Sequence, residues 1–338
     1  LHLVKAEGVT QDGKQTNFKG FYISLDFYNK RSHPWIYIQA LWAFISQPDS
    51  IIIFSTFAKN IYVILKLFRI FGIKRHIIHW VMGGAFGKQM LSGMYDTAVF
   101  ERVDWNLVQC EEMVNQLHDA GLKNVMLFRN FRNISYFPVD VINDRIAGLA
   151  DSNTGTGFVY IGRIMPEKGC DYILKAVEDL NGIGLSDRFT VDFYGKIEPS
   201  YKKIFEDKVA KCTNVTYRGV LDMRSISGYD VLASYHAMLF PTYWQREGMA
   251  GVLIDAFIAG LPVFASDWAY NAVYVKDGES GVLYPVHNVR ALADVMKNCM
   301  NHKYDLKVMS EACRNEAMKY VAEKVMSESN LRKIGLID

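Results

Sequence analysis

Cysteine is scarce in this sequence and follows no recognisable spacing. The 338 residues include five cysteines, at positions 110, 170, 212, 299 and 313, and no two of them form a C-x-x-C pair. An odd, scattered set gives neither a disulfide framework nor a cysteine-based metal site, and it suits a reducing compartment. We therefore expect a cytoplasmic protein with no bound metal.

Two further absences narrow the class of protein. Repeats and low-complexity tracts are missing, and the longest uncharged stretch, 32–48, still contains His33, Gln39 and Gln47, so no segment is predicted to span a membrane. The formal net charge is only +2, which argues against nucleic acid as the main partner. Half of the residues are hydrophobic, enough for the cores of two domains in a chain of this length.

Strand-like and helix-like segments alternate along most of the chain, which predicts doubly wound α/β layers. The polar stretch 150–157 is expected to be a linker, and the end of the chain, 310–334, is expected to be helical. In the first half we expect strands over 50–55, 75–81, 106–109 and 124–128, and helices over 60–70 and 111–120.

The segment 235–285 carries the most specific pattern. A strand over 237–240 leads to a loop ending at Glu247; small residues and a helix containing Asp255 follow. Backbone N–H groups and the dipole of a helix N-terminus together favour an anion. Two acids eight positions apart, with phosphates between them, can bind two hydroxyl-bearing parts of one ligand, which predicts a sugar-nucleotide site. The alternative is a solvated loop acid and an ordinary carboxylate on a helix face.

A second motif lies about eighty residues upstream. An apolar strand from Phe158 is followed by Gly162, by Arg163 and Lys168 five positions apart, and by an amphipathic helix. Gly162 allows close approach of a ligand to the backbone, and two cations suit a diphosphate whose charge grows as it leaves. A surface turn with two cations is the alternative for this motif when it is considered alone.

Together these motifs resemble those of the retaining glycosyltransferases of family 4, in which two acids stand in the pattern E-G-F-G-x-x-x-x-E. Glu247 matches the first acid, and Asp255 stands where a second Glu is usual, so its side chain is one methylene shorter. The resemblance implies that Glu247 binds the donor sugar, that the amides of Gly251 and Val252 bind phosphate, and that Asp255 binds the ribose. The places of G-F-G are taken by Gly248, Met249 and Ala250.

The resemblance also assigns roles outside this loop. Arg163 and Lys168 would neutralise the diphosphate, so that neither metal nor cofactor is required. Backbone groups near Gly219 and Val220 would contact the base. The family's usual Gly-rich opener is not matched after Leu1–Val4.

A first-domain glycine turn resembles one found in capsular and exopolysaccharide members of the family. It contains Gly83 and Gly84, whose amides would reach the interdomain cleft. His79, at the preceding strand, would lie near the reacting centre. The alternative for His79 is a hydrogen-bonded histidine at a strand end.

The implied fold is α/β of the GT-B type, in which two Rossmann-like domains face each other across a cleft. We expect residues 1–145 to form an acceptor-side domain and residues 146–310 to form the domain that binds the nucleotide sugar. Residues 311–338 would form a C-terminal helix that crosses back to the first domain.

Acidic residues are almost absent from the first part of the chain. Between Phe27 and Tyr95 the only acid is Asp49, and aromatic residues are interleaved with basic ones, which suits an anionic bilayer surface. The alternative is a helix buried on one face with a few solvated lysines. The basic residues are Lys30, Arg31, Lys59, Lys66, Arg69, Lys74, Arg75 and Lys88.

The sequence therefore predicts a retaining glycosyltransferase that moves a sugar from a nucleoside diphosphate, expected to be a UDP-sugar, to a hydroxyl. The expected acceptor is a saccharide or lipid-linked saccharide in surface polysaccharide or glycan synthesis, at the inner face of the membrane. Two alternatives stay open. One is a phosphorolytic enzyme of the same fold, for which no pyridoxal phosphate motif is visible, and the other is an inactive sugar-nucleotide-binding subunit.

Overall fold

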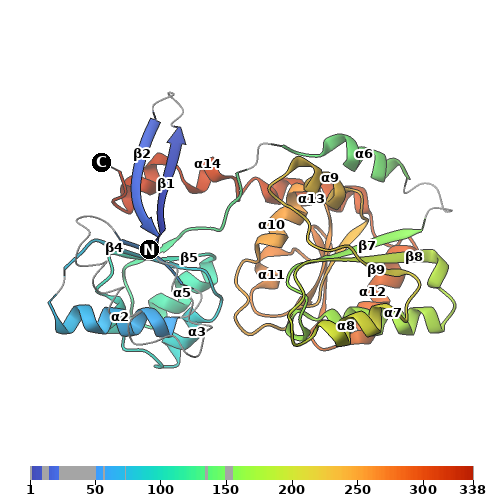
Figure 1. The fold of residues 1–338 in the computed structure, drawn as a ribbon, viewed down its shortest axis with the longest axis horizontal. Helices are drawn as coiled ribbons and strands as arrows, with labels where there is room; N and C mark the ends of the chain where they lie inside the picture. Colours follow the sequence, from blue (N-terminus) through green and yellow to red (C-terminus); the bar gives the residue numbers. More distant parts are fainter. Residues whose placement is uncertain are drawn as a thin grey trace.

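The computed structural model describes residues 2–9, 15–22, 51–55, 58–72, 74–133, 136–148 and 155–337. Two α/β halves lie side by side, each built on a parallel sheet, and a separate β-hairpin stands beside the N-terminal half (Figure 1). Part of the basic and aromatic stretch noted above, including Lys30 and Arg31, lies outside the described residues, as does 32–48.

The N-terminal half contains a four-stranded parallel sheet in the order β3-β4-β5-β6. The strands form from short apolar runs, and β4 is buried along its whole length. Its strands are β3 (Ile51–Ser55), β4 (Ile77–Val81), β5 (Trp105–Val108) and β6 (Val125–Leu127), and its helices are α2 (Ala58–Ile70), α3 (Phe86–Leu91), α4 (Thr97–Phe100) and α5 (Glu111–Asp119).

Helix α2 buries one face and exposes the other. Ile61, Ile64, Leu65 and Phe68 are buried in the core, because they recur at helical spacing on one side. Lys59, Lys66 and Arg69 lie on the exposed side, and the helix ends at the exposed apolar pair Ile70 and Phe71. This arrangement fits both interpretations of the basic residues, a membrane-contacting surface and a helix buried on one face with solvated lysines.

The C-terminal half contains a six-stranded parallel sheet in the order β12-β11-β10-β7-β8-β9. The predicted strand over 237–240 has those bounds in the structure. The strands are β7 (Thr156–Ile161), β8 (Phe189–Tyr194), β9 (Val215–Tyr217), β10 (Ala237–Phe240), β11 (Val263–Asp267) and β12 (Gly281–Pro285).

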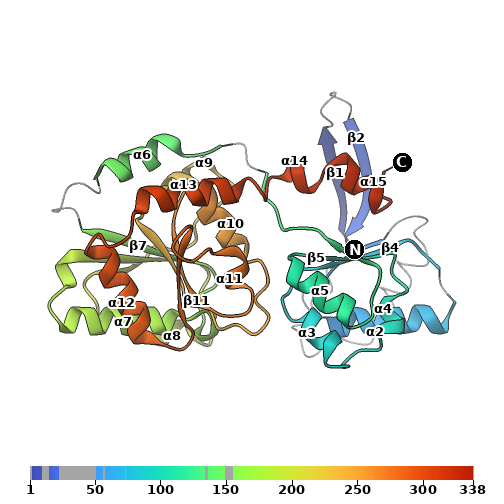
Figure 2. The same cartoon turned by 180° about the vertical axis from the view of Figure 1, so that it is seen from behind.

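The helices of this half cover both faces of its sheet (Figures 1 and 2). They are α6 (Val139–Gly148), α7 (Cys170–Gly182), α8 (Lys202–Val209), α9 (Ile226–Ala233), α10 (Gly251–Ile258), α11 (Asn271–Tyr274), α12 (Val289–Met300) and α13 (Leu306–Ala317), with short 3₁₀ turns at Pro166–Lys168 and Ser186–Arg188.

The chain passes between the halves earlier than residue 145, where we placed the domain boundary. Helix α6 packs on α9 and α13 of the C-terminal half. The physical reason is Arg145, whose buried guanidinium donates to the carbonyl oxygens of Ala233, Tyr235 and Gly260 and to the Ser310 hydroxyl. The crossing therefore lies after Arg132 and before α6.

The end of the chain returns to the N-terminal half, as Figure 2 shows. Instead of one long helix, 310–334 contains the end of α13 and two short helices, α14 (Ala322–Val325) and α15 (Glu328–Lys333). The break occurs where Arg132 forms a bridge with Val321, with backbone hydrogen bonds to Tyr320 and Ala322. Val325 and Ile334 then pack against Ile78, Trp80, Leu107 and Phe128.

The first strand is not part of either parallel sheet. β1 (His2–Val9) pairs antiparallel with β2 (Gln15–Tyr22), from His2 opposite Tyr22 to Val9 opposite Gln15. Residues 1–4 therefore do not supply the opening strand of a Rossmann-like sheet. Among the described residues, no helix is long and apolar enough to cross a membrane.

Candidate functional site

The predicted site residues gather where the strands of the C-terminal sheet end. Arg163 and Lys168 follow β7, and Glu247 follows β10 in the loop that leads to α10. The carboxyl ends of parallel strands are the usual ligand edge of such sheets, because loops and helix N-termini converge there. Strands β7 and β10 are hydrogen-bonded neighbours, so the two motifs lie next to each other.

Glu247 is a buried acid with two partners from its own half. Lys168 Nζ lies 2.5 Å from Glu247 Oε2, and the Thr242 hydroxyl donates to the same oxygen at 2.7 Å. The side chain of Glu247 is 6% exposed and that of Lys168 is 13% exposed. The acid is therefore not a solvated loop residue, and the structure brings it together with one of the two predicted phosphate ligands.

Arg163 lies on the exposed side of the same turn. Its guanidinium carbon is 5.6 Å from the centre of the Trp244 ring, a cation–π distance. The turn is shaped by Gly169, which has φ +77° and at which a β-carbon would overlap the carbonyl oxygen of Pro241. Only glycine fits this contact, which holds the Arg163–Lys168 turn against the loop that carries Glu247.

A row of glycines lines the ends of β7, β8 and β9. Gly162 donates its N–H to the Tyr194 carbonyl, and Gly195 donates to the Gly219 carbonyl. A β-carbon on Gly195 would overlap the carbonyl oxygen of Gly162. Gly219 therefore connects to the Arg163 turn through backbone contacts, while Val220 is 72% exposed beyond it.

The N-terminus of α10 has no side-chain cap. The N-cap residue is Ala250, which carries no acceptor, and Gly251 and Val252 are the first two residues of the helix. Uncapped amides at a helix start can bind an anion. Met249, one residue before the cap, is 4% exposed and has its side chain in the core. Its predicted contribution is therefore limited to backbone groups.

Asp255 is buried and paired across the two halves. Arg132 Nε donates to Asp255 Oδ1 at 2.8 Å and Arg132 Nη2 to Oδ2 at 3.1 Å, a bidentate pair, and the Tyr229 hydroxyl lies 3.3 Å from Oδ1. Asp255 is 2% exposed. It is therefore not an ordinary carboxylate on a solvated helix face, and the structure joins it to a cation that the sequence did not single out.

Residues of the N-terminal half contact the Glu247–Asp255 loop at successive positions. Gly84 donates its N–H to the Arg246 carbonyl at 3.1 Å, and a β-carbon on Gly84 would overlap the Glu247 carbonyl oxygen. Gln109 Oε1 accepts from the Met249 N–H at 2.9 Å, and Asn130 Nδ2 donates to the Met249 carbonyl at 3.3 Å. The predicted glycine turn, Gly83 and Gly84, thus reaches the candidate site.

His79 does not lie at the reacting centre, and this expectation is corrected. The residue is fully buried in β4, packed against the rings of Phe86 and Phe100, which also contact each other, and its Nδ1 lies 2.9 Å from Asn106 Oδ1. Burial lowers the pKa of His79 to about 4, which keeps the imidazole neutral. Its role is that of a hydrogen-bonded core residue of the N-terminal half.

Sequence patterns missed Gln109, Asn130 and Arg132 as residues of this site. Each comes from a segment without a motif of its own and is brought to the loop only by the packing of the halves. Among the residues described by the structure, no group of three or more His, Cys, Asp or Glu is arranged to hold a metal ion.

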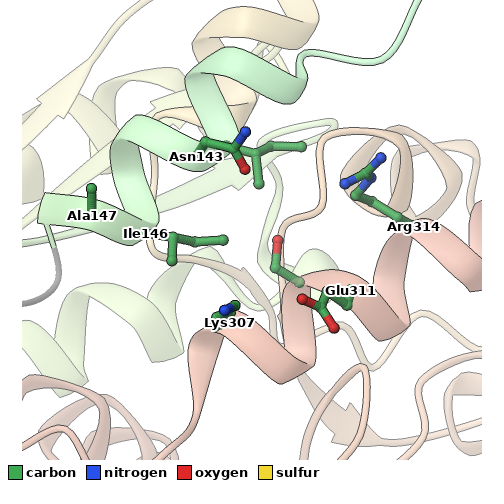
Figure 3. A pocket seen from close by; sticks show the side chains of 8 residues that line it. Asn143, Ile146, Ala147, Lys307, Glu311 and Arg314 are labelled. Atoms are coloured by element: carbon green, nitrogen blue, oxygen red, sulfur yellow. The ribbon is translucent and has the colours of Figure 1, made fainter.

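A surface pocket lies apart from these residues, between α6 and α13 (Figure 3). Its volume is about 250 Å³, and none of the predicted site residues lines it. The lining residues are Ile142, Asn143, Ile146, Ala147, Lys307, Ser310, Glu311 and Arg314.

Comparison with known proteins finds similarity to glycosyltransferases in the C-terminal half. Residues 155–302, which include Arg163, Lys168, Glu247 and Asp255, match the family model described as "Glycosyl transferases group 1". The poly(ribitol-phosphate) alpha-N-acetylglucosaminyltransferase of Staphylococcus aureus is 21% identical over 251 residues, 70% of this chain and 46% of that protein. The chain spans less than half the length of the curated relatives it matches.

Solved structures show the same fold. Sucrose-phosphate synthase of Thermosynechococcus elongatus superposes with a TM-score of 0.68 and 17% identity over 88% of this chain and 77% of that one. The pneumococcal O-GlcNAc transferase GtfA, in complex with UDP and GlcNAc, superposes with a TM-score of 0.62 and 15% identity over 89% of this chain and 60% of that one. The chain therefore has the GT-B fold, with two Rossmann-like halves.

Proposed function

We propose that this protein is a retaining glycosyltransferase of family 4 that transfers a sugar from a nucleoside diphosphate to a hydroxyl group. The observation that carries the proposal is the cluster of Arg163, Lys168 and Glu247 beside the uncapped start of α10. Two cations and the helix amides suit the diphosphate, and the buried acid suits the hydroxyl groups of a sugar. A sugar diphosphate fits this combination better than any smaller class of ligand does. The match of this half to a glycosyltransferase family model supports it.

In the proposed reaction the bond between the anomeric carbon and the phosphate oxygen breaks, and the acceptor oxygen bonds to that carbon. The acceptor's proton passes to the leaving phosphate. Arg163, Lys168 and the α10 amides stabilise the charge that develops there, without a metal or cofactor, because preorganised donors act most strongly on developing charge. Attack from the same face as the leaving phosphate retains the configuration.

The remaining site residues have binding roles in this proposal. Glu247 and the backbone at Gly248–Ala250 bind the sugar, with Gly83 and Gly84 on the opposite side. Asp255 already accepts from Arg132 and Tyr229, and since a carboxylate has about four acceptor positions, one is left for a ribose hydroxyl. Gly219 and the exposed Val220 lie at the strand ends where a base can contact the backbone.

The donor in this proposal is a UDP-sugar and the acceptor is a saccharide, free or lipid-linked, in surface polysaccharide synthesis. The relative from S. aureus, named for transfer of N-acetylglucosamine to a polyol phosphate, and GtfA with bound UDP support this choice. The test is a panel of nucleotide sugars incubated without acceptor. Slow release of nucleoside diphosphate is expected for one donor. Binding without any turnover, with or without acceptors, would instead indicate an inactive partner subunit.

We further propose that the N-terminal half contacts the inner face of the cell membrane. Support comes from the end of α2, where the exposed Ile70 and Phe71 lie next to Arg69 and close in sequence to Lys74. The test is sedimentation with vesicles: binding to anionic vesicles should exceed binding to neutral ones and should weaken in high salt. Equal binding to both kinds would remove the electrostatic part of this proposal.

A further inference from the structure

Gln109 carries a buried amide nitrogen without a hydrogen-bond partner. The residue follows β5 and is 1% exposed. Its Oε1 accepts from the Met249 N–H, and because a backbone N–H can only donate, the atom facing Met249 must be the oxygen. The orientation of the amide is thereby fixed. Within the described part of the chain, Gln109 Nε2 has no partner.

A buried donor left unpaired is costly, so it calls for a physical reason. Gln109 lies between the two glycine turns of the junction: a β-carbon on Gly248 would be 2.7 Å from Gln109 Oε1 and 3.2 Å from the Gly84 nitrogen. Glycine at both turns keeps side chains out of this position. An acceptor for Nε2 can therefore be supplied by a ligand that enters the junction.

Arg132 presents further donors from the same half. Of its five N–H groups, two donate to Asp255 and one to the Phe131 carbonyl, and the guanidinium also interacts with the Tyr229 hydroxyl, which leaves at least one N–H for another partner. Its guanidinium covers the start of α10 so closely that a β-carbon on Gly251 would overlap Nη2. A cation at the positive end of a helix is unfavourable unless an anion is present, and Asp255 supplies only one such charge.

We propose that Gln109 is a donor-binding residue, whose side-chain amide donates to an oxygen of the sugar diphosphate, and that Arg132 is a second ligand from the same side. The inference rests on the proposed function and extends it, because the donor site is then built from residues of both halves. Lys168 and the α10 amides bind the ligand from the C-terminal half; Gln109 and Arg132 bind it from the N-terminal half.

The chemistry of the junction favours an oxygen-rich anion as the occupant. The groups left for a ligand are mostly donors: the Gln109 amide, the Arg132 guanidinium and the amides of α10. The buried acids are partly engaged, Glu247 with Lys168 and Asp255 with Arg132, and their remaining acceptor positions suit sugar and ribose hydroxyls. A site of this kind suits phosphate oxygens next to hydroxyl-bearing groups.

The test compares Gln109→Glu with Gln116→Glu in titration calorimetry with UDP and with UDP-N-acetylglucosamine. Gln109→Glu keeps an oxygen for the Met249 N–H but replaces the donating nitrogen with a negative oxygen. We expect the affinity to fall at least tenfold, as expected when a hydrogen bond to a charged group is lost. Loss with both ligands assigns the contact to phosphate, and loss with the sugar nucleotide alone assigns it to the sugar.

Gln116 is the matched control because it is a second glutamine at the junction whose amide is satisfied. Its Oε1 accepts from the Tyr270 hydroxyl and its Nε2 donates to Glu112. Gln116→Glu should change the affinity less than twofold. If Gln109 only holds Met249, Gln109→Glu should change the affinity no more than Gln116→Glu does, since the bond to Met249 is kept. If Gln109→Glu fails to fold, Gln109→Met, similar in shape and uncharged, replaces it with the same expected loss.

Two failures are distinguishable. If the unmodified protein binds UDP and Gln109→Glu binds both ligands equally well, the assignment of Gln109 is wrong and the proposed function stands. If the unmodified protein binds no nucleoside diphosphate or nucleotide sugar at millimolar concentration, the proposed function falls and this assignment falls with it. Arg132→Gln should lower the affinity for UDP at least tenfold. An unchanged affinity would show that Arg132 does not bind the ligand.

Discussion

The two buried acids of the junction differ in where their partners come from. Glu247 is held by Lys168 and Thr242, both from the C-terminal half. Asp255, only eight positions later, accepts from Tyr229 of its own half but forms its bidentate pair with Arg132 of the N-terminal half. One acid therefore has all its partners in its own domain, and the ion pair of the other forms only when the two halves meet.

In the proposed function, this difference separates two roles of one loop. The geometry around Glu247 is set within a single folded unit, which suits a group that must be placed accurately for chemistry. The geometry around Asp255 depends on the docking of Arg132, whose backbone is fixed between Tyr320 and Ala322. Ligand binding at this end of the loop is then coupled to the arrangement of the halves.

The largest effect should come from removing the cations of the C-terminal half. We expect Arg163→Ala and Lys168→Ala each to lower turnover about a hundredfold or more, because a preorganised charge that stabilises the leaving diphosphate is lost. The measurement is the rate of donor hydrolysis. Lys175→Ala is the matched control, since Lys175 is an exposed lysine on α7 paired with Glu178 and Asp179.

Circular dichroism should remain native-like in both variants. Lys168→Ala also leaves Glu247 without its partner, so it should lower the thermal midpoint more than Arg163→Ala does, because Arg163 is exposed. Near-normal rates in both variants would show that the diphosphate does not lie at this turn.

A second comparison concerns one histidine from each half: His79, fully buried in β4, and His236, partly buried just before β10. Burial lowers the pKa of both to about 4. The folded-state pKa is below the unfolded value, so the folded protein binds fewer protons and loses stability as the pH falls from about 6.5 toward 4. Between pH 7 and pH 5 each histidine should cost about 2 kcal/mol of unfolding free energy.

Urea unfolding at the two pH values measures this loss. His79→Gln and His236→Gln should each be less stable at pH 7, where packing is disturbed, yet each should lose about 2 kcal/mol less than the unmodified protein on going to pH 5. A variant with an undiminished loss would show that its histidine is not held neutral in the folded state.

The C-terminal half could be predicted closely from the sequence, and the junction could not. Strand 237–240 is an apolar run followed by Pro241, and both motifs are local, so their positions follow from spacing. The hairpin of β1 and β2 was missed although Asp12-Gly13 is a turn signal, because only residues 1–4 were considered as a strand.

A histidine at a strand end next to a glycine turn can be a site residue or a hydrogen-bonded core residue, and the sequence is the same in both cases. His79 was predicted to lie near the reacting centre for this reason. Only its burial against Phe86 and Phe100 in the structure separates the two explanations. Arg132 and Asp255 are 123 positions apart, and no local pattern connects them. Contacts of this kind follow from packing of the halves, which sequence periodicity does not encode.

The smallest effect on activity is expected from a substitution of Asp255. It is also the one that best separates the roles of the two acids. Asp255→Asn should raise the Michaelis constant for the donor about tenfold and change the catalytic rate little, because a uniform binding contact is lost. Glu247→Ala should instead lower the rate steeply, since the sugar contacts tighten as the anomeric bond breaks. Asp255→Glu should be tolerated, because a longer carboxylate can still accept from Arg132 or from a ribose.

A double-mutant cycle then decides how Asp255 acts. If Asp255 works by orienting Arg132, the effects of Asp255→Asn and Arg132→Gln on UDP affinity should be strongly non-additive, with a coupling energy of about 1 kcal/mol or more. If Asp255 binds the ribose independently, the two effects should add. Additivity would mean that the bidentate pair with Arg132 has only a structural role. Asp255 would then act on the donor as directly as Glu247 does, despite its different partners. Strong coupling would make Asp255 the residue through which contact between the halves determines the affinity for the donor.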